Sequence, residues 1–310
     1  MPSPSFLAHI QSLKNRFSPT EKVLYAILSV ALAVSLLGIA LDINSRYTVP
    51  VARPGGTLTE GIVGFPRFIN PLFAFSDADR DLTALIYSGL LKYEPDGSLI
   101  PDIAESYTIA ADGLTYSFRI KEEARFHDGV AITADDILFT VLRAQDPNIK
   151  SPKRANWEGV TVEKKSDQEV IFTLRHPFAP FLENTTIGIL PAHLWKNIDP
   201  EQFIFSDLNS SPIGSGPYRV ADNSRDNTGR PSTYTLHAYK KYTLGTPYIE
   251  KIVALFYQNE DEVVQAFRRG DIDTLNGISP AHAKLLESER IQDRIERVPL
   301  PRVFSVFFNQ

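Results

Sequence analysis

The sequence predicts a mixed α/β protein preceded by one transmembrane helix. Three observations support this fold class. Residues Val23 to Leu41 form an uncharged apolar run, short segments further along carry apolar residues at every second position, and segments with helical spacing lie between them. The chain has 310 residues, which is enough for more than one compact domain.

The composition excludes several classes of protein. A net charge of −5 at pH 7, with no basic run in which aromatic residues are interleaved, argues against nucleic-acid binding. The chain contains no cysteine, which excludes disulfide bonds, thiolate metal sites, cysteine nucleophiles and a lipid-modified cysteine anchor. We expect no cofactor and no metal, because no two of the six histidines have the close helical spacing of a zinc site.

The apolar run from Val23 to Leu41 has the length of a membrane-spanning helix. A bilayer core needs about 20 apolar residues in helical form, whereas a cleavable signal peptide has an apolar region of roughly 7–15 residues. No convincing Ala-x-Ala cleavage site follows the run. We therefore expect an uncleaved anchor at residues 23–43, with a cleaved signal peptide and a buried core helix as the alternatives.

The segments on either side of the anchor determine its expected orientation. Lys14, Arg16 and Lys22 precede the run, which is a weak positive-inside bias. Residues 1–22 are therefore expected in the cytoplasm, and the globular part is expected outside it, in the periplasm or at the cell surface. Residues 44–54 contain two prolines and are expected to form a linker.

A β-hairpin is predicted around residue 112. Apolar and polar residues alternate from Leu114 to Ile120, which is the period of a half-buried strand. Asp112-Gly113 is a turn signal, and Tyr107 to Ile109 is the expected partner strand.

A capped helix is predicted to follow. Asp128-Gly129 marks a second turn, and Thr133 stands three residues before Asp136, which is a variant of the capping box. The apolar residues of the next segment, 137–142, have helical spacing.

Further elements are predicted from the same patterns. Strands are expected at residues 57–61, 160–163, 170–174, 218–220, 233–239 and 249–256. Helices are expected at residues 79–89 and 260–269, and the second of these ends at Gly270. The apolar segment from Val303 to Asn309 has the pattern of one more strand.

Several motifs resemble those of the family 5 extracellular solute-binding proteins, which are the peptide-, oligopeptide- and nickel-binding receptors of ABC importers. The motifs are Asn70-Pro71, Pro101 to Tyr107, Phe126 to Gly129, Gly214 to Tyr218 and Gly270 to Asp273. Ser215 stands where the family has threonine. The resemblance extends from Gly55 to Gln310, and the motifs occur in the family's order.

The resemblance implies a type II periplasmic-binding-protein-like fold, of which this chain carries the first lobe. That lobe is expected at residues 55–75 and 191–300, with a peripheral α+β subdomain at residues 76–190. Residues 301–310 are expected to begin the crossover to a second lobe that is missing from the chain.

The resemblance also implies a binding protein and not an enzyme. We expect the substrate-binding component of an ABC transporter, which captures a peptide or another small solute by lobe closure and presents it to permease subunits. The ligand, the identity of the permease and whether the chain ends naturally cannot be read from the sequence.

The resemblance directs attention to three places for ligand binding. They are Phe75, Ser76 and Asp77 in the loop after Asn70-Pro71, Trp157, and the turn Asn276-Gly277. Asp77 could meet the α-amino group of a peptide, or it could be the N-cap of the next helix. Trp157 could border the cleft or pack in the core.

Two other functions are alternatives. An extracytoplasmic hydrolase would need a nucleophile or a carboxylate pair, and the best candidates are His127-Asp128 and Asp135-Asp136. The first pair is better explained by a turn, since neighbours on a strand face opposite ways, and the second by the favourable first turn of a helix. A sensory or structural ectodomain without transport is the other alternative.

Overall fold

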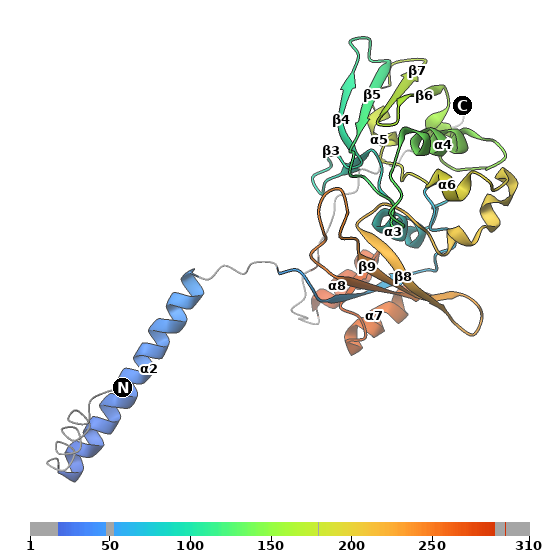
Figure 1. The fold of residues 1–310 in the computed structure, drawn as a ribbon. Coiled ribbons are helices and arrows are strands. Elements are labelled where there is room, and N and C mark those ends of the chain that lie inside the picture. Colours follow the sequence, from blue (N-terminus) through green and yellow to red (C-terminus); the bar gives the residue numbers. More distant parts are fainter. Residues whose placement is uncertain (1–17, 48–52, 179, 289–294, 296–310) are drawn as a thin grey trace, which may run out of the picture. The chain divides into compact units, whose positions relative to one another are not determined.

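The computed structural model describes residues 18–47, 53–178, 180–288 and 295. The chain divides into two compact units, Met1–Arg53 and Pro54–Gln310. The described part of the first unit is one helix, and the second unit holds every strand that the structure describes (Figure 1).

Helix α2 (Pro19–Tyr47) contains the apolar run. At its start the backbone N–H of Ser18 donates to Oε2 of Glu21 over 2.7 Å, and Oγ of Ser18 accepts from the Glu21 N–H over 3.4 Å. The segment Pro19–Ile43 is long and apolar enough to cross a membrane, and 0% of its most apolar window is buried. The predicted continuous helix, apolar on all sides and exposed, is confirmed.

A five-stranded mixed sheet forms the base of the second unit. Its strands are β1 (Thr57–Val63), β8 (Tyr218–Arg225), β9 (Pro231–Ala238), β10 (Lys251–Tyr257) and β11 (Thr274–Asn276), in the order β11-β1-β10-β9-β8. Strand β1 is parallel to both β10 and β11, whereas β9 is antiparallel to its neighbours. The predicted strands near residues 57, 218, 233 and 249 therefore share one sheet.

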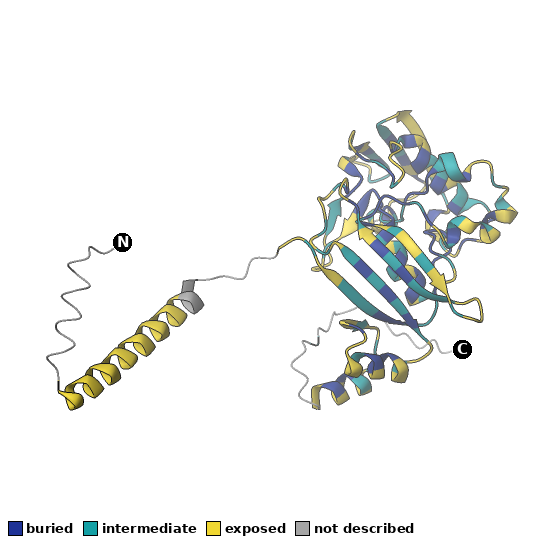
Figure 2. Ribbon diagram, turned by 60° about the horizontal axis from the view of Figure 1, so that its bottom comes forward, coloured by how far each residue is buried: buried dark blue, intermediate teal, exposed yellow. Residues whose placement is uncertain are grey.

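Helices cover the two faces of this sheet. Helix α3 (Asp77–Ile86) lies on one side, and α7 (Glu260–Arg269) and α8 (Pro280–Ser288) lie on the other (Figure 1). Burial alternates along β10: Ala254 and Phe256 belong to the main core, whereas Leu255 and Tyr257 pack against the core under α7. Figure 2 shows this alternation as bands across the sheet.

A four-stranded antiparallel sheet forms the other end of the unit. Its strands are β4 (Ala104–Ile109), β5 (Thr115–Ile120), β6 (Val160–Ser166) and β7 (Glu169–Leu174), in the order β4-β5-β7-β6. Tyr107 lies opposite Phe118, so the predicted hairpin is confirmed. A short ladder pairs β2 (Leu91–Tyr93) with β3 (Leu99–Pro101).

Helix α4 (Ala134–Gln145) covers the small sheet and is closed at its start as expected. Oδ2 of Asp136 accepts from the backbone N–H of Thr133 over 2.9 Å. Its other oxygen accepts from the N–H of Ala192 over 2.9 Å, at the start of α6 (Ala192–Trp195). The carboxylate therefore joins two helices, and Asp135-Asp136 has a structural role at a helix start.

Short helical turns complete the unit. They are η1 (Arg154–Trp157), α5 (Phe181–Asn184), η2 (Pro200–Phe205) and η3 (Asp207–Asn209). One buried hydrophobic core continues from the large sheet to the small one. The boundary of the peripheral subdomain at residues 76–190 stays a prediction, and the predicted strand from Val303 to Asn309 lies outside the described residues.

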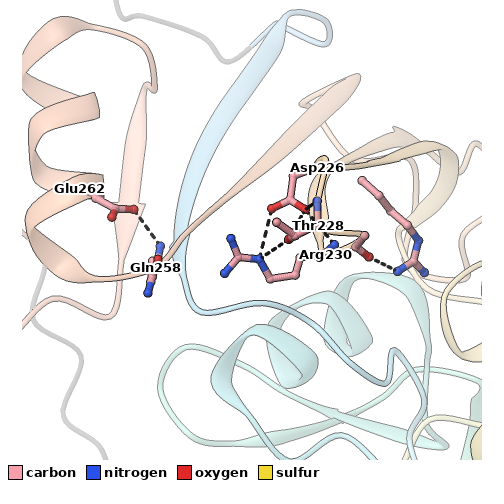
Figure 3. Close-up of polar contacts among 7 residues, drawn as sticks. Asp226, Thr228, Arg230, Gln258 and Glu262 are labelled. Atoms are coloured by element: carbon pink, nitrogen blue, oxygen red, sulfur yellow. Dashed lines mark hydrogen bonds and ion pairs between the residues drawn. The ribbon is translucent and has the colours of Figure 1, made fainter.

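A polar network closes the turn between β8 and β9 (Figure 3). Oδ1 of Asp226 accepts from the hydroxyl of Thr228 over 2.6 Å and from the N–H of Arg230 over 3.0 Å. The bond from the Thr228 hydroxyl is the main cause that lowers the pKa of Asp226 to about 2.

The same view shows Glu262 of α7, whose Oε2 accepts from the N–H of Gln258 over 3.1 Å.

Candidate ligand-binding face

The loop before α3 is held by a buried carboxylate. Asp79, which is 2% exposed, accepts backbone hydrogen bonds from Arg67 over 2.7 Å and from Phe68 over 2.9 Å. It also accepts from the N–H of Ser76 over 3.1 Å. Two separate stretches of main chain are thereby fixed to one side chain.

Ser76 is the N-cap of α3, one residue before the expected alternative at Asp77. Its hydroxyl accepts from the N–H of Asp79 over 3.1 Å, which completes a capping box with the bond in the other direction. The N-cap interpretation of Asp77 is therefore wrong, because Ser76 occupies that position. Asp77 lies in the first turn of the helix, where its negative charge is favourable.

The loop presents an aromatic ring and an ion pair to solvent. The Phe75 side chain is 75% exposed. Asp77 forms a salt bridge with Arg80, and Nη1 of Arg80 also donates to the carbonyl of Phe75 over 2.6 Å. The three predicted loop residues, Phe75, Ser76 and Asp77, therefore lie on an ordered and accessible segment.

A second predicted position meets the same helix. Nδ2 of Asn276, at the end of β11, donates to Oδ2 of Asp81 on α3 over 3.1 Å. Gly277 follows with φ at 72°, the left-handed conformation that glycine adopts freely in a turn. The structure thus brings Asn276 and the start of α3 together although 195 positions separate Asn276 from Asp81.

Three carboxylates form an acidic cluster at this point: Glu60 of β1, with Asp77 and Asp81 of α3. Burial is the main cause that raises the pKa of Asp81, and repulsion from Asp77 adds to it. Burial also raises the pKa of Glu60, with a contribution from Asp81. Sequence reasoning missed Asp81 and Glu60. The spacing of Asp81 four residues after Asp77 was a signal that both would share one helix face.

A groove of about 400 Å³ runs along the other side of the same loop and helix. We call it the α3 groove. Its walls include Ala74, Arg80, Thr83 and Tyr87, and the loop that carries Lys153 and Trp157. Arg80 therefore connects the acidic cluster with the groove, since it borders the groove and pairs with Asp77.

Two hydroxyl groups in the α3 groove lack hydrogen-bond partners. Oγ1 of Thr83 and the hydroxyl of Tyr87 are buried, and neither has a partner within the part of the chain that the structure describes. Burial strongly raises the pKa of Tyr87. An unpaired buried polar group costs about 1–3 kcal/mol, so these two hydroxyls lower the stability of the region behind the groove.

The charged side chains of the groove are mainly positive. Arg80 and Lys153 are both partly exposed, and Lys153 forms no ion pair within residues 53–178 and 180–288. The groove also contains a carboxylate, that of Glu183. Burial is the main cause that raises the pKa of Tyr93, and the hydrogen bond of Tyr93 with Glu183 adds to this effect.

Trp157 lies largely in the core. It is 2% exposed, and its ring centroid lies 6.0 Å from that of Phe172 and 6.1 Å from that of Phe181. It also borders the α3 groove. The packing alternative describes most of the indole, and its role toward a ligand stays a prediction.

His127 is held by the Gly214-Ser215-Gly216 segment. Its Nδ1 accepts from the N–H of Gly214 over 3.3 Å, so Nε2 carries the proton and donates to the carbonyl of Gly216 over 3.1 Å. Burial lowers the pKa of His127 to about 4, which keeps the ring neutral. Both ring nitrogens are occupied by main chain, as expected for a structural residue.

Comparison with known proteins identifies the family. The family model described as bacterial extracellular solute-binding proteins, family 5 (middle region), matches residues 98–310. The chain belongs to this family. The predicted family and the predicted type II periplasmic-binding-protein-like fold are therefore confirmed.

The relatives include peptide-binding proteins. The oligopeptide-binding protein AppA of Bacillus subtilis is 29% identical over 260 residues, which cover 82% of this chain and 47% of AppA. Di/tripeptide-binding protein 2 of Pseudomonas aeruginosa is 30% identical over 208 residues, covering 60% of this chain and 38% of that protein. The chain spans about half the length of the curated relatives it matches.

Solved structures show the same fold. The structure of AppA from Bacillus subtilis in complex with a nonapeptide has a TM-score of 0.69 and 29% identity, and covers 77% of this chain and 47% of AppA. NikZ from Campylobacter jejuni, in complex with Ni(L-His), has a TM-score of 0.66 and 27% identity, and covers 76% of this chain and 45% of NikZ.

Proposed function

We propose that this chain is the first lobe of the substrate-binding component of an ABC importer and that it binds peptides. The observation that carries the proposal is the ordered loop of Phe75, Ser76 and Asp77, which lies between the acidic side chain of Asp81 and a groove with two cations. The names of the relatives support a peptide as the ligand.

The charges of this face are complementary to those of a peptide, which has a positive α-amino group at one end and acceptor oxygens along its length. Its α-amino group would be attracted by Asp77 and Asp81, and Asn276-Gly277 borders the same cluster. Its carbonyl or carboxylate oxygens would accept from Arg80 and Lys153 of the α3 groove. Main-chain contacts with the exposed loop would add affinity without selecting side chains.

Capture would follow from closure of two lobes. The described lobe supplies one wall of a cleft, and a second lobe would close over the peptide by a hinge before presentation to permease subunits. Most of the contacts of an enclosed ligand come from such enclosure. We therefore expect weak binding by this lobe alone and much tighter binding by a chain that also carries the second lobe.

The binding face can be located by photo-crosslinking, which captures weak complexes. We expect a pool of short diazirine-labelled peptides to attach to residues 75–87 and 153–157 of the full chain, as found by mass spectrometry. N-acetylation of the peptides should reduce the yield, since it removes the positive charge. Attachment confined to other surfaces would contradict the proposed face.

Asp81→Asn is the sharpest single change. Loss of its charge should weaken binding of free peptides by at least roughly tenfold, since a hydrogen bond to a charged group contributes about 1.5–3 kcal/mol. It should leave binding of acetylated peptides unchanged. Glu123→Gln, at an exposed position on the loop after β5, removes the same charge and is the matched control. The dependence of the crosslinking yield on peptide concentration measures both, and equal losses in the two variants would contradict a role for Asp81.

We also propose that α2 is an uncleaved anchor and that the second unit lies outside the cytoplasm. The exposed apolar length of α2 supports this, and the family's extracellular description supports the location. N-terminal sequencing of the protein from cells is the test. A mature N-terminus near Asn44 would show that the helix is a signal peptide.

A further inference from the structure

A second groove, of about 660 Å³, lies where the chain enters the second unit. Pro54 and Gly55 form part of its wall, and the connection between β9 and β10, residues 239–250, forms much of the rest. The N–H of Gly55 donates to the carbonyl of Tyr248 over 2.7 Å, which joins the two segments. We call this groove, together with the connection, the entry face.

The connection of the entry face is anchored from beneath. Tyr242 is buried, and its hydroxyl donates to Oδ2 of Asp102 over 3.2 Å. The hydroxyl of Thr243 donates to the other oxygen of Asp102. These bonds fix the middle of the connection to the segment before β4, so its remaining side chains are presented outward in a defined arrangement.

The outward side chains combine apolar groups with cations. Leu244 is 40% exposed and Tyr248 is 62% exposed. Lys240 and Lys241 are exposed beside them. Lysine with tyrosine and an aliphatic residue is the combination that proteins place at the interface between lipid headgroups and acyl chains.

The entry face is locally cationic on a chain whose net charge is −5. Its cations are Arg219, Lys240 and Lys241, and none of them forms an ion pair within residues 53–178 and 180–288. Its carboxylates are Glu250 and Asp128, and the second lies 2.7 Å from Nε2 of His193. The anionic remainder of the chain would be repelled by an anionic surface, so such a surface would favour contact through a locally cationic face of this kind.

The position of the entry face in the sequence limits its distance from α2. The helix ends at Tyr47, eight residues before Gly55. Eight residues span at most about 28 Å when fully extended. A groove that begins at Gly55 is therefore within reach of a bilayer surface whenever α2 spans that bilayer.

We propose that the entry face docks on an anionic phospholipid surface. Lys240, Lys241 and Arg219 would contact lipid phosphates, while Leu244 and Tyr248 would enter the headgroup layer. The inference rests on the proposed anchor, and it is independent of peptide binding, since the entry face and the α3 groove share no residue. Docking would restrict the second unit to the membrane surface.

The absence of cysteine allows a direct test with the full chain in lipid nanodiscs. Leu244→Cys, labelled with nitrobenzoxadiazole, reports on the entry face, and Ile109→Cys, exposed on β4, is the reference position. With phosphatidylglycerol in the disc, we expect the label at residue 244 to shift to shorter wavelength and to be quenched by spin-labelled lipid. The label at residue 109 should not respond, and added salt should reverse the response at 244.

Charge variants separate docking from mere proximity. Lys240→Gln and Lys241→Gln should each lower the docking equilibrium by roughly fivefold. Lys121→Gln and Lys196→Gln each remove the same single charge elsewhere, and neither should have an effect. Equal quenching at 244 and 109, or no dependence on phosphatidylglycerol, would overturn the proposal. Failure of the chain to co-elute with nanodiscs would refute the anchor and the docking together, whereas peptide crosslinking is unaffected by either result.

Discussion

At the scale of single residues, buried polar side chains organise the candidate binding face. The carboxylate of Asp79 accepts from N–H groups in two stretches of the connection between β1 and α3, and His127 bonds to the main chain on both sides of Ser215. Each side chain satisfies backbone groups that would otherwise be buried without partners. Replacement of either side chain should therefore lower the free energy of unfolding more than it lowers the affinity for a peptide.

Asp79→Asn tests the first of these arrangements. An amide has one acceptor oxygen in place of two, and its N–H₂ group would face either the N–H of Arg67, at Oδ1, or the N–H of Ser76, at Oδ2. We expect a loss of about 1–3 kcal/mol in the free energy of unfolding, together with faster hydrogen exchange at the Phe68 and Ser76 amides. Chemical denaturation and exchange measurements check both.

A matched control is Asp112→Asn, since Asp112 accepts from the N–H of Leu114 over 2.9 Å at an exposed turn. We expect Asp112→Asn to lower the free energy of unfolding by at most about 0.5 kcal/mol. Equal losses at Asp79 and Asp112 would contradict the organising role of Asp79.

His127 predicts a dependence of stability on acid. Its pKa is lowered from 6.5 to about 4 in the folded chain, so the unfolded chain binds the proton more readily. The neutral ring therefore contributes fully to the free energy of unfolding above pH 6.5, and this contribution is lost as the pH falls toward 4. The upper limit of the contribution is about 3 kcal/mol. Denaturation between pH 7 and pH 4 should show the loss.

The variant His127→Gln isolates this effect. Glutamine can accept and donate without titrating, so the variant should lose the part of the pH dependence that His127 causes. An unchanged pH profile in the variant would assign the dependence to other groups.

At the scale of elements, the Gly214-Ser215-Gly216 segment fits against the end of α3. The N–H of Gly216 donates to the carbonyl of Ile86 over 2.8 Å, which satisfies a carbonyl at the C-terminal end of the helix. A Cβ on Gly216 would lie 2.7 Å from the carbonyl carbon of Ile86 and 2.8 Å from the carbonyl oxygen of Leu85. The motif therefore serves close approach of two backbones, which only glycine allows.

Gly216→Ala should consequently destabilise the second unit. The contacts are with backbone atoms that cannot move aside, so we expect a cost of about 1–3 kcal/mol and a lower thermal midpoint. Gly38→Ala, in α2, adds the same methyl group where nothing lies within 4 Å, and it should leave that midpoint unchanged. Calorimetric scans compare the two variants. A thermal midpoint for Gly216→Ala equal to that of the parent chain would show that the backbone of this segment can shift to accommodate the added methyl group.

At the scale of the whole molecule, the helix and the globular part are separate compact units. The apolar span of α2 buries none of its surface in the protein. An exposed apolar helix of this kind is stabilised by a lipid or detergent environment.

Removal of residues 1–53 should leave the unfolding of the second unit unchanged. The reason is that the apolar window of α2 is not buried in the protein. Scanning calorimetry of the full chain in detergent and of residues 54–310 in the same detergent makes the comparison. A lower midpoint for the shorter chain would reveal a contribution from the first unit.

The local patterns of the sequence determined much of the architecture. The alternation at residues 114–120, the capping residues Thr133 and Asp136, and the glycine after α7 each led to the element that the structure contains. The uncharged run led to α2. Each of these signals acts over a few neighbouring residues, so it can be read without knowing the fold.

Only the tertiary structure decided what meets at the candidate site. The sequence pointed to Asp77 and Asn276 through a resemblance, but their common neighbour Asp81 and the unpaired hydroxyls of Thr83 and Tyr87 emerged from packing. A partner 195 residues away along the chain leaves no local signature. Burial, which raises the pKa of Asp81 and leaves a hydroxyl without a partner, is a property of the assembled fold and not of the sequence around the residue.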